Sequence, residues 1–172
     1  MTRLGNFRKL GLAAFLALPA ILGIGGCKNA PPADVADRLW VKQMPTGPRD
    51  VIDAFVVTEV GKRSAGSYYH GSVYRGAHDT FMWRSKGKNS GVIYILQEQR
   101  EYGVEAKPCT PDRGFDMCME LKGDPKKVVR YQSRKRWAIP RRDKSEGLDV
   151  PMLMQQIAED DADLEALLAV ED

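Results

Sequence analysis

The sequence predicts a mainly β protein: a small antiparallel meander of six or seven strands, closed as a barrel or folded as a sandwich, followed by a C-terminal α-helix. Three observations predict this class. Residues 49–140 contain short runs rich in β-branched and aromatic residues, which are typical of strands. Short turns separate these runs without an intervening helical pattern, which disfavours a parallel α/β sheet. Apolar residues recur at helical spacing only after residue 140.

Residues 1–26 have the organisation of a secretory leader. Arg3, Arg8 and Lys9 precede an uncharged stretch, residues 10–26, which ends in small residues. This stretch has about 17 residues, at the low end of the length that crosses a bilayer, and it contains a proline. A cleaved leader is therefore favoured over a transmembrane anchor.

The end of the leader, Ile24-Gly25-Gly26-Cys27, resembles the lipobox of bacterial lipoproteins. The resemblance covers about the first 27 residues only, and the mature domain resembles no family that we recognise. It implies cleavage after Gly26, a lipid on the sulfur of Cys27 and a subsequent N-acylation. It also implies a membrane-anchored place in the bacterial cell envelope. By the same resemblance, Lys28 favours the outer membrane, with the domain facing the periplasm.

Residues 27–48 are interpreted as the lipidated cysteine and a tether. The segment 28–37 is short, polar and proline-bearing, which suits a spacer between membrane and domain. Residues 39–41 form a small apolar patch, which would pack as a lid or as a first strand. Proline and glycine residues between 45 and 48 end this patch.

Residues 49–140 are interpreted as the antiparallel β domain. Its predicted strands lie at 54–60, 67–75, 78–84, 92–97, 102–106, 115–121 and 128–139. Phe81 and Trp83 share a face of their strand because successive side chains alternate. The run 92–97 is apolar on both faces, as a central strand would be. The run 128–139 places Tyr131 and Trp137 on one face and several arginines on the other.

Residues 141–172 are interpreted as a charged linker and an acidic C-terminal helix. Pro151 suits the first turn of a helix. The apolar residues that follow recur at roughly helical spacing: Leu153, Ile157, Leu164 and Leu168. Asp160 and Asp161 interrupt this stripe, so we expect the helix to dock on the barrel over only part of its length.

Charge is divided between the body and the tail. Residues 27–142 contain 22 Lys and Arg against 13 Asp and Glu, a net charge of +9, whereas residues 143–172 contain ten acids and one lysine, a net charge of −9. Either the tail folds back onto the body or the body meets an anionic surface. In a cell envelope, lipid headgroups are more accessible anions than nucleic acid, so no nucleic-acid partner is expected.

The remaining cysteines predict a disulfide. Once Cys27 carries a lipid, Cys109 and Cys118 are left as a pair, and two such thiols oxidise outside the cytoplasm. A closed loop of about ten residues stabilises a fold by roughly 2.5 to 3 kcal/mol. A metal or redox pair would instead require closer CxxC spacing or a neighbouring histidine.

The two histidines carry the only catalytic hypothesis. His70 and His78 could join Asp79 as a metal site or a general acid–base pair, or they could be ordinary surface imidazoles. The sequence has no HExxH motif, no GxSxG motif and no recognisable catalytic cysteine. We therefore expect no enzyme activity, no cofactor and no metal.

A basic strip near the end of the β domain is the candidate binding surface. It combines cations with two aromatic residues: Arg130, Tyr131, Arg134, Lys135, Arg136 and Trp137. The alternative is an edge strand that its charges keep soluble, or one that the acidic tail covers. The sequence leaves both interpretations open.

The expected function is that of a non-catalytic structural or accessory binding subunit of the envelope. Its partner would be an envelope protein, an anionic lipid or a glycan, met through the basic β surface. The alternative is a lipocalin-like carrier of a small apolar ligand, with aromatic residues lining its cavity. An internal cavity of a few hundred Å³ would favour the carrier, and a filled interior would favour the accessory role.

Overall fold

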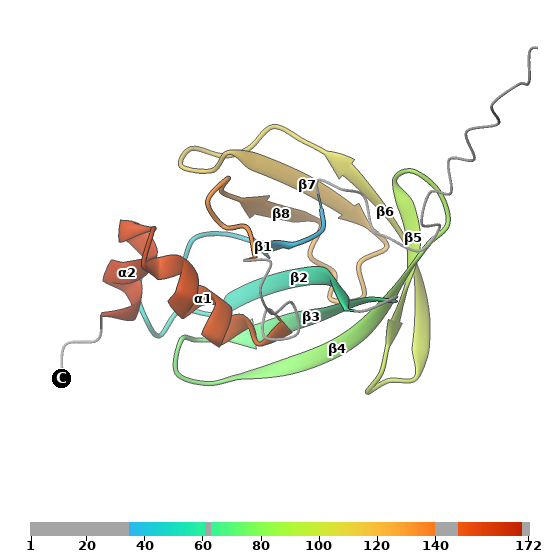
Figure 1. The fold of residues 1–172 in the computed structure, drawn as a ribbon, viewed down its shortest axis with the longest axis horizontal. Helices are drawn as coiled ribbons and strands as arrows, with labels where there is room; N and C mark the ends of the chain where they lie inside the picture. The colour runs from blue at the N-terminus through green and yellow to red at the C-terminus, as the bar shows by residue number, and fades with distance from the viewer. Residues whose placement is uncertain (1–34, 61–62, 140–147, 170–172) are drawn as a thin grey trace, which may run out of the picture.

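The computed structural model describes residues 35–60, 63–139 and 148–169, which form an antiparallel β-barrel with two helices packed beside it (Figure 1). The elements are β1 (Arg38–Val41), β2 (Ile52–Val60), β3 (Arg63–Gly71), β4 (Gly76–Ser85), β5 (Ser90–Ile95), β6 (Arg100–Pro108), β7 (Met117–Lys122), β8 (Arg130–Ser133), α1 (Val150–Ala158) and α2 (Ala162–Leu168). Each strand pairs with its neighbours in sequence, and β1 also pairs with β8. The mainly β class and the barrel are confirmed, but the strands number eight rather than six or seven.

The additional strand is β1, which lies within residues 27–48 and not in the predicted β domain. Its four residues pair with β2 from Arg38↔Val57 to Val41↔Ala54. On its other edge, the Leu39 amide donates to the Trp137 carbonyl at 3.0 Å. The apolar patch is therefore the strand that closes the barrel, and the barrel begins before residue 49.

Aromatic rings fill the interior of the barrel. The Phe55 ring lies 5.2 Å from Tyr68, 5.5 Å from Phe81 and 5.6 Å from Tyr131, measured between centroids. A Cβ atom at Gly66 would lie 2.0 Å from the Phe81 ring, so a glycine is needed where this ring crosses β3. Trp83 belongs to the same interior cluster, which confirms its predicted shared face with Phe81.

Burial alternates along β5 more strongly than its apolar sequence indicated. Ile93 and Ile95 are buried in the interior cluster, whereas Val92 and Tyr94 are only half-buried. The outer face of β5 is therefore less buried than the central position expected from its apolar residues would make it. The described strands with buried side chains on both faces include β1, β2, β3 and β8, and α1 contacts the first three of them.

The two helices bury a second apolar cluster against the outside of the barrel. Outward side chains such as Leu39, Val56 and Tyr69 pack there with Leu153 of α1 and Leu164 of α2. Burial of an apolar side chain of this size contributes about 1.5 to 3 kcal/mol. Figure 1 shows α1 and α2 side by side at one flank of the barrel, close to β1 and β2.

The tail forms two helices where one was predicted. Asp149 begins α1 by accepting a hydrogen bond from the Met152 amide at 3.1 Å, with a proline in the first turn as expected. Asp161 then begins α2 by accepting from the Asp163 and Leu164 amides. The first amides of a helix have no carbonyl partner within it, and an aspartate cap accepts hydrogen bonds from them. The cap at Asp161 therefore marks a new helix and separates α2 from α1.

Strand β8 is shorter than the predicted strand 128–139. It ends at Ser133, and the chain then turns, with the Trp137 amide donating to the Arg134 carbonyl at 3.0 Å. Tyr131 consequently faces the barrel interior, whereas Trp137 belongs to the outer cluster under the helices. The predicted common face of these two residues is wrong because the turn breaks the two-residue period.

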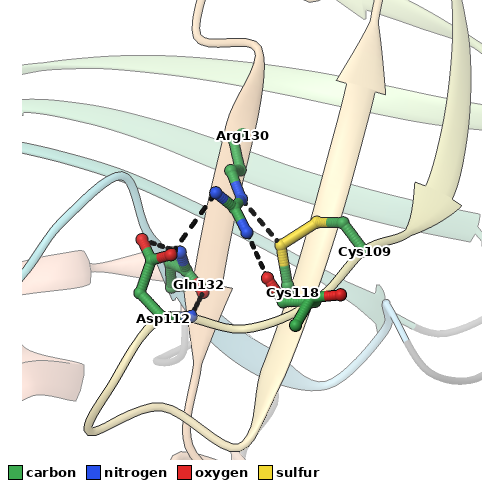
Figure 2. Close-up of a disulfide and its surroundings, with 6 residues drawn as sticks. Cys109, Asp112, Cys118, Arg130 and Gln132 are labelled. Carbon is green, nitrogen blue, oxygen red and sulfur yellow. Dashed lines mark hydrogen bonds and ion pairs between the residues drawn. A yellow bond between two sulfur atoms is a disulfide. The ribbon is translucent and has the colours of Figure 1, made fainter.

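A disulfide joins Cys109, which follows β6, to Cys118 of β7 (Figure 2), as predicted. It closes the β6–β7 connection into a loop of about ten residues, which stabilises the fold by about 2.5 kcal/mol on the chain-entropy argument. Figure 2 shows Arg130 of β8 beside the bridge: its Nε lies 3.0 Å from Cys118 Sγ, and its Nη1 lies 3.3 Å from Asp112 Oδ1. The bridge therefore sits within a small polar network that links three strands.

One buried carboxylate connects the tail to the barrel. The Asp161 side chain is fully buried and accepts hydrogen bonds from Arg134 Nη1 at 2.8 Å, Arg136 Nε at 2.8 Å and Trp137 Nε1 at 2.6 Å. Burial raises the pKa of Asp161, but the hydrogen bonds from Trp137, Arg136 and Arg134 together hold it below its ordinary value of 3.8. Asp161 therefore remains ionised between the barrel and α2.

Asp161→Asn is expected to lower the free energy of unfolding by about 3 kcal/mol at pH 7, because it removes the charge that compensates a buried arginine. The folded pKa of Asp161 lies below its unfolded value, so the stabilisation is present above pH about 4 and is lost as the pH falls through the folded pKa. Urea unfolding of both proteins between pH 7 and pH 3 measures this difference. The exposed Asp160→Asn is the matched control, and equal losses in both variants would contradict the role of Asp161.

Candidate functional site

A cavity of about 350 Å³ opens at one end of the barrel. Because the strands run up and down, the β1–β2, β3–β4, β5–β6 and β7–β8 connections all surround this end. We call its lining the polar mouth, which comprises Lys42, Asp53, Ala54, Tyr68, Tyr69, His70, Asp79, Lys126, Lys127, Val128 and Tyr131. The inward side chains thus change from apolar at the centre of the barrel to charged at this end.

Asp53 and His70 form a close pair in the polar mouth. They lie directly opposite each other on β2 and β3, two positions beyond Phe55 and Tyr68 and therefore on the same inward face. His70 Nδ1 lies 2.6 Å from Asp53 Oδ1, and Lys42 Nζ lies 3.4 Å from Asp53 Oδ2. The His70 side chain is 70% exposed. With Nδ1 held by the carboxylate, Nε2 remains available to a ligand.

Lys126 forms the opposite wall of the polar mouth. Its Nζ lies 2.7 Å from Asp79 Oδ2 and 3.2 Å from Glu98 Oε1. Burial lowers the pKa of Lys126, but its hydrogen bonds to the two carboxylates raise it above the ordinary value. The lysine therefore stays charged and ties the β7–β8 connection to β4 and to the β5–β6 turn.

Two tyrosines and a buried aspartate form the floor of the polar mouth. The Tyr68 hydroxyl donates to Asp124 Oδ1 at 2.7 Å, the Tyr131 hydroxyl donates to Oδ2 at 3.1 Å, and the Val128 amide donates to Oδ2 at 2.8 Å. Burial raises the pKa of Asp124, and these hydrogen bonds offset part of the rise. Burial and the neighbouring Asp124 also raise the pKa of Tyr68 well above 10.0. Both hydroxyls are thus protonated at neutral pH and directed to Asp124.

The chemistry open to the polar mouth depends on what surrounds its Asp53–His70 pair. An aspartate that orients a histidine is the usual arrangement of a general base, yet within the described ranges no Ser, Thr or Cys side chain hydrogen-bonds to His70. The same ranges contain no cluster of three or more His, Cys, Asp or Glu residues placed to hold a metal ion. The groups that line the opening include charged and hydrogen-bonding side chains from β2, β3, β4 and the β7–β8 connection.

Among the other hollows around the filled core, two have aromatic side chains in their lining. One, of about 230 Å³, lies at the opposite end of the barrel beside the disulfide and is lined by apolar residues that include Val35, Trp40 and Met117. The other, of about 420 Å³, is lined mainly by β4 and β5, with Met82 and Tyr94 among its residues. Trp83 also lines this hollow, and its buried indole nitrogen has no hydrogen-bond partner in the part of the chain that the structure describes.

The six residues of the predicted basic strip do not share one exposed surface. Tyr131 is in the barrel interior and Trp137 is in the outer cluster. The Arg134 side chain is only 8% exposed and pairs with Asp161 and Asp163, and Arg130 lies beside the disulfide. Lys135 and Arg136 remain exposed. The turn after β8 scatters these residues, and the acidic tail neutralises two of the arginines.

The two histidines lie on different sides of the barrel wall. His70 faces the polar mouth, where it meets Asp53 and not Asp79 as hypothesised. His78 packs on Tyr69, with the ring centroids 4.9 Å apart. Their eight-residue separation in sequence suggested one site, but the β3–β4 register places Tyr69 and not His70 opposite His78.

Sequence reasoning missed Lys42, Asp53 and Lys126 as parts of a site. The signal for Asp53 was present in the strand period, since Asp53 shares a face with Phe55 as His70 does with Tyr68. Lys126 lies in a connection, where periodicity carries no information. Only the packing of the β7–β8 connection across the opening brings it to Asp79.

Cys27 and the leader lie outside the described residues, so the predicted lipidation site has no structural description. Neither α1 nor α2 is long and apolar enough to span a bilayer.

Comparison of the chain with known protein families, with curated proteins and with solved structures found no significant match.

Tyr131→Phe is expected to lower the free energy of unfolding by about 1.5 to 3 kcal/mol at pH 7, the usual contribution of a hydrogen bond to a charged group. Loss of this donor raises the pKa of Asp124 further, and an acid with a raised folded pKa loses stability as the pH rises through that range. The loss should therefore be larger at pH 7 than at pH 4. Urea unfolding checks this, with Tyr94→Phe as the control; a pH-independent loss would contradict the role of Asp124.

Proposed function

We propose that the chain is a lipid-anchored bacterial envelope lipoprotein that acts as a non-catalytic accessory binding subunit. The support for the anchor is the leader, with its basic start, its apolar stretch and Cys27 after two glycines. The Cys109–Cys118 disulfide fits the oxidising compartment that this anchor implies. By the resemblance to lipoproteins, Lys28 favours an outer-membrane location with the barrel facing the periplasm.

The binding position that we propose is the polar mouth and not the centre of the barrel. The observation that carries this is the packing of the interior, where the Phe55 ring meets Tyr68, Phe81 and Tyr131 with centroids 5.2 to 5.6 Å apart. A ligand can enter only the ends of such a barrel, because packed rings leave no room for a guest. The 350 Å³ polar mouth offers Lys42, Lys127 and His70 to a small polar or anionic group of a partner.

The alternative function, a lipocalin-like carrier of a small apolar ligand, is supported only by the barrel fold. An eight-stranded barrel can hold one small ligand when its centre is hollow. Here the interior positions from Trp40 to Tyr131 are occupied by side chains of one continuous cluster. A carrier of an apolar molecule would have to use a hollow at the margin of this cluster, such as the 230 Å³ hollow beside the disulfide or the 420 Å³ hollow along β4 and β5.

Cys27→Ser is expected to abolish fatty-acid labelling and to leave the leader uncleaved by the lipoprotein-processing peptidase, because the acylated sulfur is the signal for that cleavage. Metabolic labelling with a fatty acid and intact-mass measurement of the purified protein check this. Cys118→Ser, which removes a different cysteine, is the control and should retain the label. Labelling that persists in Cys27→Ser would refute the anchor.

A photo-crosslinking amino acid at His70, introduced into the full chain in its native envelope, is expected to capture a discrete partner or ligand. The side chain is 70% exposed and faces the polar mouth, so a probe there samples whatever the mouth binds. Glu120, exposed on the outer face of β7, is the control position. Mass spectrometry of the adducts is the measurement, and equal capture at both positions, or none at His70, would count against binding in the mouth.

A further inference from the structure

Exposed apolar side chains gather at the end of the barrel that contains the polar mouth. The five large apolar side chains exposed among the described residues are Val51, Tyr74, Leu96, Val129 and Met152. Four of these five lie at the β1–β2, β3–β4, β5–β6 and β7–β8 connections, one at each. The fifth, Met152, is on α1. Their fractional exposures at the mouth range from 44% to 69%, so each connection presents one apolar side chain to solvent.

An exposed cation lies within four positions of each of these apolar residues, in the same connection or, for Leu96, at the first residue of β6. These cations are Arg49, Arg75, Arg100 and Lys127. Three of them, Arg49, Arg75 and Lys127, have no ion-pair partner among the described residues. Arg100 lies over the Tyr102 ring, 5.2 Å from its centroid. We call these four cations and the four apolar residues the rim.

The acids of these connections are already engaged within the protein. Asp50 accepts hydrogen bonds from the Thr46 amide at 2.9 Å and its hydroxyl at 2.6 Å, and the Thr46 hydroxyl and amide hold its pKa below the ordinary value. Glu98 accepts from the Tyr102 hydroxyl and pairs with Lys126. Both carboxylates keep their charge, but the four connections together with Arg100 hold six Lys and Arg against three Asp and Glu, a net formal charge of +3. The rim therefore lies at an end that is cationic on balance as well as apolar, and its complement is an anionic surface with an apolar interior.

The opposite end of the barrel provides an internal comparison. Its β4–β5 and β6–β7 connections expose three cations, Lys86, Lys88 and Arg113. Neither connection carries a large exposed apolar side chain. Exposed cations are thus found at both ends of the barrel, but within the described ranges only the polar-mouth end combines them with apolar residues in its connections.

We propose that the rim docks on the surface of an anionic lipid bilayer. A cation beside an apolar side chain suits the headgroup boundary, where the cation meets lipid phosphate and the apolar group enters the upper acyl region. The pair recurs at all four connections around one opening and is not concentrated at any one of them. Such a surface fits a fluid bilayer better than one protein partner, whose contacts would concentrate in a single central patch.

The position of the first described residue is compatible with docking on the membrane that would hold the anchor. Val35 lies at the opposite end, where its carbonyl accepts from Trp40 Nε1 at 3.0 Å. The eight residue steps from Cys27 to Val35 span at most about 28 Å. Nine-residue strands are about 30 Å long, and at the usual barrel tilt they stand about 22 Å tall. The tether is therefore long enough to run past the barrel, although docking itself requires no lipid on Cys27.

The test uses the chain from Lys28 to Asp172, which retains every contact described above and lacks the leader and Cys27. Co-sedimentation with phosphatidylcholine vesicles, with and without about one third phosphatidylglycerol, measures binding near physiological salt and again at higher salt, where screening weakens contacts to headgroups. Binding to the anionic vesicles that falls with salt is expected. An absence of binding to the anionic vesicles, or equal binding to both kinds, would overturn the proposal.

Variants separate the rim from charge in general. Arg49→Gln, Arg75→Gln and Lys127→Gln combined should weaken binding roughly 100-fold, at about fivefold for each cation near the surface. Lys86→Gln, Lys88→Gln and Arg113→Gln remove the same charge from the opposite end and should have little effect. Val51→Ser, Tyr74→Ser, Leu96→Ser and Val129→Ser combined should also weaken binding. Equal losses from the two charge variants, or no loss from the apolar variant, would overturn docking through the rim.

A single substitution tests the orientation without removing any charge. Tyr74→Trp places an indole on the rim, whereas Trp40, Trp83 and Trp137 of the native chain are buried. Brominated lipids in anionic vesicles should quench this added fluorescence, and they should not quench that of Lys88→Trp at the opposite end. Quenching at Lys88→Trp alone, or at neither position while the protein is bound, would place another face on the bilayer and refute the proposal.

Discussion

Closure of the barrel by β1 is the constraint on which the other features depend. This strand has four residues, yet it joins β2 on one edge to β8 on the other. The Ser133 hydroxyl adds a hydrogen bond to the Leu39 carbonyl at 2.6 Å. Closure defines an inside and an outside for every strand, and thereby two ends. Without β1, the edges of β2 and β8 would be open, and the barrel would lose the enclosed interior that Phe55 and the neighbouring aromatic rings fill.

The same closure brings part of the basic body into contact with the acidic tail. Because β8 ends at Ser133 and the chain turns back along β1, Arg134 and Trp137 come to lie under the helices. There the buried Asp161 accepts from both side chains and begins α2. A buried ion pair of this kind stabilises the fold only when its partners are complete. Among the described residues, the basic body and the acidic tail therefore meet where Asp161 pairs with Arg134 and Arg136, and where Asp163 also pairs with Arg134.

The distribution of polar groups inside the barrel relates the fold to the proposed binding. Aromatic packing occupies the centre, so the chemistry that a ligand can reach lies at the ends. At one end, the inward positions carry Asp53, His70 and Lys126 above a floor of tyrosines that a buried aspartate holds. The connections around that end carry the cations and apolar residues of the rim. Mouth and rim thus face the same direction, which is what a barrel that binds at its end requires.

The sequence by itself determined the features that depend on local pattern. Strand alternation located most strands and placed Phe81 with Trp83, spacing and compartment paired Cys109 with Cys118, and Pro151 marked the first helix. These features follow from side-chain period, loop length and backbone preference, which act over a few residues. Only the tertiary structure decided that the patch around Trp40 closes a barrel, that Arg134 is buried against Asp161, and that Lys126 crosses the opening to Asp79. Each of these joins residues far apart in the chain, because closure and packing select among many partners that local pattern leaves equivalent.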